Sequence, residues 1–386
     1  MMRHGFANGH IVTGAGVLPE ATIDCDSGGR ITALTSAAHG DAVNLDGGWL
    51  VPGFIDTQVN GGGGVLFNDD PTVAGIAAIG AAHAPFGTTG FMPTLISDTP
   101  AVIARAMDAV DAAIDAGVPG VLGIHVEGPV LNVSRKGIHD PARFQGLDDE
   151  LLALLTRPRR GVVMVTLAPE RVGVERIRAL AAAGVRVALG HTDADRATAA
   201  AAFAAGATGV THLFNAMSPL SHRAPGVVGA ALDDQQAWCG IIVDGFHVDD
   251  AALRIALRAR PIDRFMLVSD AMPCVGAAEK DFMLQGRPIH VEGGRCVGAD
   301  GTLAGSDLDM AGAVRNAVTR LGLPVEAAAA LASASPAAFL GLEHDRGRLA
   351  VGRRADWVRL DAALRPVGTW IGGAPAGVDV PLEALA

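Results

Sequence analysis

Short apolar runs alternate with alanine-rich segments from residue 53 to about residue 340. The segments between most of the runs, such as AVIARAMDAVDAAIDAG, are apolar at helical spacing and end in Gly. Near-continuous apolar strands that are separated by helices predict a parallel sheet covered on both faces. The runs are GFIDTQVN, GTTGFMPTL, VLGIHVEGP, GVVMVTLAP, RVALGHTDA, GVTHLFNAM, WCGIIVDGFHV and FMLVSDAMP.

Eight strand–helix units within residues 52–344 match an α/β fold of the (β/α)8 TIM-barrel type in number and length. A doubly wound open sheet is the alternative. In such a sheet the ligand-binding residues gather at one switch point, whereas here polar residues follow nearly all of the strands. The barrel is therefore the predicted fold of this region.

The two ends of the chain have a different pattern from the middle. Residues 1–51 and 345–386 alternate on a two-residue period, with Gly, Asp and Pro at the turns. We expect them to pair with each other as one small β-sandwich domain formed by both termini. Residues 281–303 predict a hairpin that is inserted after the eighth barrel strand.

Composition narrows the class of protein. The chain has 386 residues, of which 49% are hydrophobic, enough for one large domain and a small one. Its formal net charge of −11 argues against a nucleic-acid surface, which needs a basic stripe. The sequence shows no membrane span and no apolar core of a secretory signal. Four scattered cysteines without C-x-x-C spacing fit a reducing compartment, so we expect a cytoplasmic protein.

Barrel enzymes carry their catalytic groups at the carboxyl ends of the strands and in the loops that follow. Taken singly, each polar residue at these positions has an ordinary structural explanation, such as a hydrogen-bonded core histidine or a helix N-cap. Taken together, they would face one crater, where their desolvation requires a metal or a substrate to offset it. The residues are Asp56, Gln58, Asn60, His125, Glu127, His191, His212, Asn215, Asp244, His247 and Asp270.

Glu127, His191 and His212 supply a carboxylate and two imidazoles. Such a set binds one Zn²⁺ or Fe²⁺ ion and leaves a position open for water. The ion lowers the pKa of that water from about 15.7 to about 7, which makes it a nucleophile at neutral pH. Asp270, after the eighth strand, is expected to take the proton and later deliver it to a leaving group.

The first strand ends in Gln58-x-Asn60, where many metal-dependent hydrolases have His-x-His. Amide side chains are poor ligands for a borderline-soft ion. The chain has two lysines, Lys136 and Lys280, and neither ends a predicted strand, so no lysine is placed to bridge two ions. We therefore predict one divalent ion per chain, with the two amides hydrogen-bonded to the water or the substrate.

Several stretches together carry a resemblance to a known family. They are PGFIDTQVNGGGGVLFND, GIHVEGPVLN, RKGIHD, LGHTDA, THLFNAMSPLSHRAPGVVGAALD, GIIVDGFHVD, VSDAM and GTLAGS. In number and order they resemble the amidohydrolase superfamily and, within it, the N-acetylglucosamine-6-phosphate deacetylases, nearly from end to end. In that family the Gln-x-Asn form of the first motif is the single-metal variant. Departures are few: Ser269 stands where Thr is frequent, and the residues around Arg223 vary.

The resemblance implies roles for individual residues and a homodimer. Glu127, His191 and His212 would hold the metal. Asp270 would be the acid/base, and His139 would help to polarise the acetamide carbonyl. In the same family Asn215, Ala216, Arg223 and His247 contact the sugar phosphate, and Arg223 and His247 are expected to bind its phosphate group. The backbone of Leu303, Ala304 and Gly305 would close over the ligand. The other predicted substrate contacts are Gln58, Asn60, Ile138 and Asp244.

The implied reaction converts a small phosphorylated amino sugar, N-acetyl-D-glucosamine 6-phosphate, to D-glucosamine 6-phosphate and acetate. Three alternatives stay open. The galactosamine epimer differs at C4, whose partner the sequence does not identify. A cyclic-amide hydrolase such as a dihydroorotase is disfavoured by the missing His-x-His and bridging lysine. A metal-free barrel kept for assembly is disfavoured because Glu127, both ligand histidines and Asp270 are present.

Overall fold

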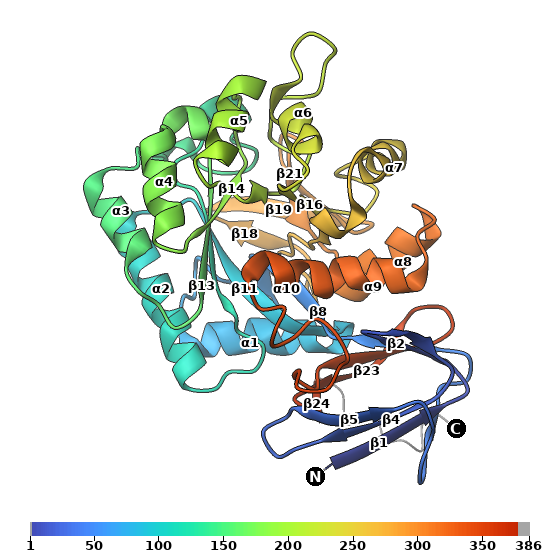
Figure 1. Cartoon of the computed structure of the whole chain (residues 1–386). Coiled ribbons are helices and arrows are strands. Elements are labelled where there is room, and N and C mark those ends of the chain that lie inside the picture. Colours follow the sequence, from blue (N-terminus) through green and yellow to red (C-terminus); the bar gives the residue numbers. More distant parts are fainter. Residues whose placement is uncertain (1, 377–386) are drawn as a thin grey trace.

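The chain folds into a parallel barrel ringed by helices, with a smaller β region beneath it (Figure 1). This computed structural model describes residues 2–376, so residues 377–386 of the predicted C-terminal β segment lie outside the described part. The barrel strands follow sequence order around one sheet, and paired neighbours run parallel. They are β8 Phe54–Val59, β11 Thr88–Ile96, β12 Gly123–Glu127, β13 Val162–Leu167, β14 Arg186–Leu189, β15 Gly209–Val210, β16 Trp238–Ile241 and β17 Phe265–Leu267.

The barrel closes between its first and last strands through a few contacts just beyond β17. Val59 bridges to Ala271, and the amide of Asn60 donates to the carbonyl of Ala271 at 2.9 Å. Beside them, the Asp56 carboxylate accepts hydrogen bonds from the backbone amide and the hydroxyl of Ser269. The predicted TIM-type barrel is confirmed.

Helices follow the strands and bury their apolar faces against the barrel. In α2, Pro100–Asp115, the Thr99 side chain accepts from the amide of Val102, and Pro at the first helical position starts the helix. Ile103 and Val110, spaced two turns apart, are both buried. The other helices are α1 Val73–His83, α3 Asp149–Thr156, α4 Val174–Ala182, α5 Arg196–Ala204, α6 Gly226–Asp233, α7 Asp250–Ala259, α8 Met310–Thr319, α9 Val325–Ala332 and α10 Ala334–Leu340.

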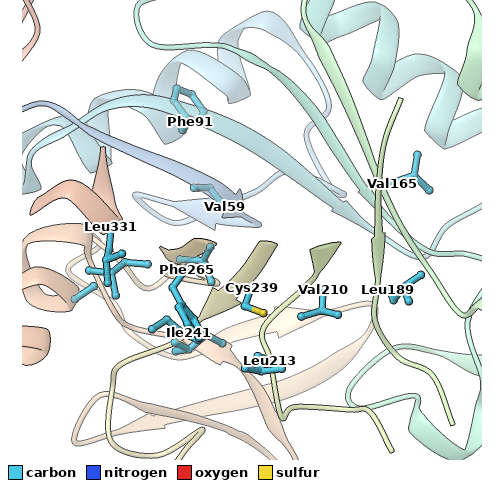
Figure 2. Packing of buried hydrophobic residues seen from close by; sticks show 14 of the residues in the cluster. Val59, Phe91, Val165, Leu189, Val210, Leu213, Cys239, Ile241, Phe265 and Leu331 are labelled. Carbon is cyan, nitrogen blue, oxygen red and sulfur yellow. The ribbon is translucent and has the colours of Figure 1, made fainter. Parts of the chain in front are cut away.

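Apolar side chains form the main core of the barrel and its surrounding helices, as Figure 2 shows for residues of several neighbouring strands. Leu189 of β14 and Val210 of β15, for example, are register partners. A separate apolar cluster contains Met92, Met164 and Phe339 of α10. The strands are therefore held by packing, and the polar groups at their carboxyl ends are free for other roles.

A polar layer follows this apolar cluster along the strands. Two residues beyond Met164 on β13, Thr166 Oγ1 lies 2.7 Å from His125 Nε2 and 2.6 Å from Thr211 Oγ1. Thr94 Oγ1 lies 3.3 Å from His125 Nδ1. Both nitrogens of His125 are thus hydrogen-bonded in the core, so this histidine has the ordinary structural role.

The smaller region has two sheets that together confirm the predicted β-sandwich. The larger joins both ends of the chain, because β7 pairs with β22. Phe6, Ile23 and Trp357 are buried in the core of this region. One sheet contains β1 Met2–Ala7, β4 Ala21–Cys25, β5 Ile31–Thr35 and β6 Val43–Asn44; the other contains β2 His10–Thr13, β3 Gly16–Leu18, β7 Trp49–Pro52, β22 Trp357–Leu360, β23 Pro366–Ile371 and β24 Ala374–Ala376.

The segment after β17 forms a larger structure than the predicted hairpin. It is a four-stranded antiparallel sheet, which we call the lid sheet. Its last strand returns to the barrel, where the amide of Ser306 donates to the carbonyl of Asp270 at 2.9 Å. The lid strands are β18 Phe282–Leu284, β19 Arg287–Glu292, β20 Arg295–Gly298 and β21 Leu303–Ser306, and a short hairpin near the first strand end comprises β9 Gly61–Gly62 and β10 Val65–Leu66. Within residues 2–376, no helix combines the length and the apolar composition that a membrane crossing requires.

Candidate active site

A pocket of about 340 Å³ opens at the carboxyl ends of the barrel strands. Its walls come from the strand ends, the loops that follow them and the lid sheet. Most of the predicted site residues line this pocket, and their roles stay predictions. The predicted site residues that line it are Asn60, Glu127, Ile138, His139, His191, His212, Asn215, Ala216, His247, Asp270, Leu303 and Gly305.

Four other predicted site residues are not among those that line the pocket. Gln58 and Ala304 are buried behind its wall, and Asp244 accepts a hydrogen bond from His247. Arg223 is exposed on the loop that precedes α6, which projects from the barrel in Figure 1. Arg223 is thus outside the pocket of its own chain, and its role stays a prediction.

The three predicted metal ligands meet in a tight triangle. Glu127 Oε1 lies 3.2 Å from His191 Nε2 and 3.0 Å from His212 Nε2, and the two nitrogens are 3.2 Å apart. Ligands held about 2.0–2.1 Å from a tetrahedral ion stand about 3.3 Å from one another. All three side chains are buried. The residues present therefore fit a divalent ion, and this donor set suits Zn²⁺ or Fe²⁺.

The charge of this triangle is set by Glu127. Although burial alone would raise it, the close contacts with the His191 and His212 rings hold the pKa of Glu127 well below its ordinary value. Burial lowers the pKa of His212, but the hydrogen bond with Glu127 and the negative charges of Glu127 and Asp270 together outweigh burial, so the net shift is upward. Glu127 is thus ionised, and a cation bound between the three side chains would compensate its buried charge.

The backbone at His191, His212 and Asp270 is unusual. Their φ angles of 48°, 33° and 52° lie in the left-handed region that residues other than glycine seldom adopt. Such conformations persist only where the surrounding structure enforces them, and they cluster at functional sites. Each of these residues lies within three positions of the end of a barrel strand. The turns after β14, β15 and β17 are thus built to aim these side chains into the pocket.

A fourth group, His139, lies beside Glu127. Its Nε2 is 3.8 Å from Glu127 Oε2, and one ligand atom from each of Glu127, His139 and His191 lies within 4.8 Å of the others. Burial, aided by His191, lowers the pKa of His139 to about 3, so the ring is neutral. Distance alone thus allows two overlapping ligand sets, one with His212 and one with His139.

The second ring nitrogen orients His191. Its Nδ1 lies 2.9 Å from the backbone carbonyl of Arg135. A carbonyl only accepts, so the hydrogen is on Nδ1 and the lone pair of Nε2 faces the triangle, as a metal ligand requires. His212 Nδ1 has no hydrogen-bond partner within the described chain.

Asp270 lies beside the triangle and is held by the two amides of the first strand. Its Oδ1 accepts from Asn60 Nδ2 at 2.7 Å and from Gln58 Nε2 at 3.0 Å. Gln58 Nε2 also lies 3.3 Å from Glu127 Oε1. Burial, together with the charge of Glu127, raises the pKa of Asp270 to about 6. A carboxylate with a pKa near neutrality is suited to accept and return a proton.

His247 and Asp244 form a pair at the pocket edge. His247 Nδ1 donates to Asp244 Oδ2 at 2.6 Å, and the amides of Phe246 and His247 donate to Asp244 Oδ1. Although burial opposes it, the hydrogen bonds from His247 hold the pKa of Asp244 below its ordinary value. Because Nδ1 is engaged with Asp244, Nε2 is the nitrogen of His247 that remains for a ligand.

The lid sheet touches the reacting region at Gly305. This residue has φ 59°, and a Cβ there would come 2.7 Å from the Asp270 carbonyl and 2.5 Å from Met272 Cγ. Only glycine allows β21 to pass so close to Asp270. The lid strand therefore helps to fix the backbone that carries the predicted acid/base.

Two residues at the site were missed in the sequence. Arg135 lines the pocket and pairs with Asp193 at 2.8 Å; its place next to KGIH in a quoted motif was a usable signal. Ser97 directly follows β11 and contacts His139. It gave no signal, because a lone serine after an apolar run is typical of a turn or a helix start.

A buried carboxylate–imidazole triangle that faces an acidic residue at the mouth of a (β/α)8 barrel defines a metal-dependent hydrolase class of site. Sequence comparison agrees: the profile of the amidohydrolase family matches residues 49–380. The chain belongs to the amidohydrolase family. The homologues described next confirm the predicted resemblance to the amino-sugar-phosphate deacetylases of that family.

The chain is 45% identical over 329 residues to an N-acetylgalactosamine-6-phosphate deacetylase from Shewanella sp. (strain ANA-3), covering 85% of this chain and 83% of the relative. It is 39% identical over 340 residues to the N-acetylglucosamine-6-phosphate deacetylase of Mus musculus, covering 84% and 82%. A Mycobacterium smegmatis variant N-acetyl-D-glucosamine-6-phosphate deacetylase, solved in complex with N-acetyl-D-glucosamine 6-phosphate, superposes with TM-score 0.90. That structure is 34% identical, and the alignment covers 97% of this chain and 98% of its own.

Proposed function

We propose that this protein hydrolyses N-acetyl-D-glucosamine 6-phosphate to D-glucosamine 6-phosphate and acetate. The observation that carries the proposal is the triangle of Glu127, His191 and His212, which faces Asp270 across one pocket. The similarity to deacetylases that act on phosphorylated N-acetylhexosamines supports the substrate class.

The chain's own residues supply most of the proposed mechanism. When bound to Glu127, His191 and His212, a divalent ion supplies positive charge that polarises a carbonyl and acidifies water. Asp270 accepts the proton of the attacking water and returns it to the departing sugar nitrogen. His139 polarises the acetamide carbonyl from beside Glu127. The lid sheet closes the pocket through Leu303 and Gly305.

The 6-phosphate is proposed to bind to His247 and Arg135, which both line the pocket. Arg135 presents a guanidinium, whose planar fork suits phosphate oxygens. Arg223 was predicted for this role, and its exposed loop suggests that it acts across a dimer, in the pocket of a second copy. This proposal agrees with the homodimer that the family resemblance implies.

The N-acetylgalactosamine 6-phosphate epimer is a second candidate substrate. The 45% identical Shewanella relative favours it, while the 39% identical mouse relative and the Mycobacterium complex favour the glucosamine form. Asn60 and Ala216 line the pocket, and neither residue type distinguishes the C4 epimers. The overall sequence identity therefore does not decide between the two epimers, and the substrate panel described below does.

Other parts of the proposal concern the molecule as a whole. We propose Zn²⁺ or Fe²⁺ as the ion, a cytoplasmic location, and domains formed by residues 1–51 with 345–386 and by residues 52–344. The cytoplasmic location is supported by the four described cysteines, all of them free. Within residues 2–376, Cys274 Sγ and Cys296 Sγ come as close as 3.6 Å without a bond.

The direct test is a panel of N-acetylated hexosamines, with and without 6-phosphate, scored for acetate release by the metal-loaded protein. We expect high kcat/KM only for the 6-phosphorylated sugars, and the ratio of the two epimers assigns the substrate. Faster turnover of a cyclic amide, or no acetate release from any sugar, would overturn the proposal.

Arginine variants test the phosphate site. Arg135→Ala and Arg223→Ala should each raise KM for the phosphorylated sugar about tenfold to a hundredfold, because each removes a charge-assisted contact. Arg143→Ala is the matched control, since Arg143 lies in the same loop but pairs with Asp98 outside the pocket. An equal loss with the unphosphorylated sugar would show that the arginine is structural.

A further inference from the structure

Ser97 makes two contacts with the same ring nitrogen of His139. Its hydroxyl oxygen lies 2.8 Å from His139 Nδ1, and its backbone amide points at that nitrogen from 3.4 Å. Both side chains are buried, with exposed fractions of 1% for Ser97 and 2% for His139. No reaction step described so far uses Ser97.

These contacts decide where the hydrogen of the neutral His139 ring lies. A backbone amide can only donate, so a hydrogen on Nδ1 would face the amide hydrogen of Ser97. Nδ1 is therefore the acceptor, and the shorter hydroxyl contact supplies the stronger donor. The hydroxyl has a weaker alternative, the carbonyl of Glu127 at 3.4 Å. The ring hydrogen is left on Nε2, the nitrogen that faces Glu127 Oε2 and the pocket.

We propose that Ser97 is a positioning residue that fixes His139 as a hydrogen-bond donor at Nε2 and thereby excludes it from the metal ligands. This inference rests on the proposed deacetylase function for its catalytic meaning, but the position of the hydrogen is a property of the protein alone. A donor at Nε2 can stabilise the negative charge that develops on the acetamide oxygen, whereas a lone pair there would compete for the ion.

His191 shows the opposite arrangement in the same pocket. Its Nδ1 faces a carbonyl and so carries the hydrogen, which leaves Nε2 to bind a metal. His139 faces two donors, so its Nε2 carries the hydrogen. The group that faces Nδ1 therefore determines whether Nε2 carries a hydrogen, as in His139, or a lone pair, as in His191. It selects Glu127, His191 and His212 over the overlapping set that contains His139.

The position of Ser97 is itself fixed by the lid sheet. Gln285, in the turn between β18 and β19, donates from Nε2 to the Ser97 carbonyl at 3.0 Å. Gly128 leaves room for the hydroxyl, because a Cβ there would lie 2.2 Å from Ser97 Oγ. The backbone around Ser97 is thus held from two sides, which suits a residue whose role is orientation.

Nitrogen NMR of the histidine rings tests the hydrogen position directly. In ¹⁵N-histidine-labelled protein, the His139 signals are identified by their absence in His139→Ala. We expect Nδ1 to resonate far downfield, as a nitrogen without hydrogen, and Nε2 to carry the hydrogen. Ser97→Ala should move the Nδ1 signal, whereas Ser333→Ala, which removes a buried hydroxyl bonded to a helix carbonyl, should not. A hydrogen on Nδ1 would overturn the proposal whatever the substrate proves to be.

Kinetics test whether Ser97 acts through His139. Ser97→Ala should lower kcat about two- to tenfold with little change in KM or metal content, because one hydrogen bond to a neutral acceptor is lost. In a His139→Ala background the same change should cost nothing further. An equal loss in both backgrounds, or an unchanged kcat in Ser97→Ala, would show that Ser97 does not position His139. Absence of acetate release from the unmodified protein would instead refute the proposed function and leave the NMR result standing.

Discussion

Two walls of the pocket use polar side chains in opposite ways. On the wall formed by β12, β14 and β15, lone pairs of Glu127, His191 and His212 converge within 3.2 Å of one another. On the wall formed by β8, hydrogen-bearing amides of Gln58 and Asn60 converge on the carboxylate of Asp270. One wall is built to hold a cation and the other to hold an anion.

This difference explains the amides of the first strand. Histidines at positions 58 and 60 would add lone pairs and could bind a second ion. The amides instead donate to Asp270 Oδ1, which fixes the orientation of the predicted acid/base. Asn60 Oδ1 is buried and has no hydrogen-bond partner among residues 2–376. The wall formed by β8 is therefore suited to proton transfer, and the wall formed by β12, β14 and β15 is suited to metal binding.

The largest effect is expected from Asp270→Asn. The amide keeps the shape but takes no proton, so kcat should fall about 10²- to 10⁴-fold while the metal stays bound. Asp300→Asn, in the exposed turn after β20, is the matched control. In the metal-loaded protein, kcat/KM should decline at acidic pH, because the base form of Asp270 is lost. Burial raises the pKa of Asp270 to about 6, and the nearby cation opposes this shift, so the decline is expected below pH 6. Near-normal turnover of metal-replete Asp270→Asn would remove the residue from the mechanism.

Asn60→Ala is expected to have a smaller effect of the same kind. It removes the 2.7 Å donor to Asp270, and hydrogen bonds to charged groups contribute enough that kcat should fall about tenfold to a hundredfold. Metal content, measured on the same sample, should not change. Loss of metal in Asn60→Ala would show that Asn60 contributes to metal binding and not only to the orientation of Asp270.

The smallest effect concerns stability rather than chemistry. Asp56 accepts from Ser269 and from the amide of Gln58, and so joins β8 to the segment that carries Asp270. Asp56→Asn exchanges one acceptor for a donor, which should lower the free energy of unfolding by about 1–3 kcal/mol. Urea denaturation would measure it, with Asp26→Asn in an exposed turn of the small domain as the comparison. An unchanged midpoint would show that barrel closure does not depend on Asp56.

The residues of the cation-holding wall were easier to predict from sequence than the residues that surround and orient the site. Strand periodicity placed Glu127, His191 and His212 at strand ends, and parallel strands bring such ends together. The hydrogen bonds of Asp270 to Gln58 and Asn60 join the first strand end to the last, which meet only when the barrel closes. Ser97 contacts the site only because of the orientation of the His139 ring, and Arg135 reaches the pocket only because of the conformation of its loop. Hydrophobic patterning predicts neither feature. Arg223 was predicted from a motif, and a motif does not show that its exposed loop lies outside the pocket of its own chain.

The metal content of the unmodified protein and of two variants tests most directly whether only the wall formed by β12, β14 and β15 binds metal. The unmodified protein, purified without chelator, should contain about one transition-metal ion per chain, as three-ligand catalytic sites do. Glu127→Ala should contain none, because it breaks the triangle, and Gln58→Ala should contain as much as the unmodified protein. Two ions per chain in the active protein, with one lost in Gln58→Ala, would show that the first strand binds metal and would contradict the account of the two walls.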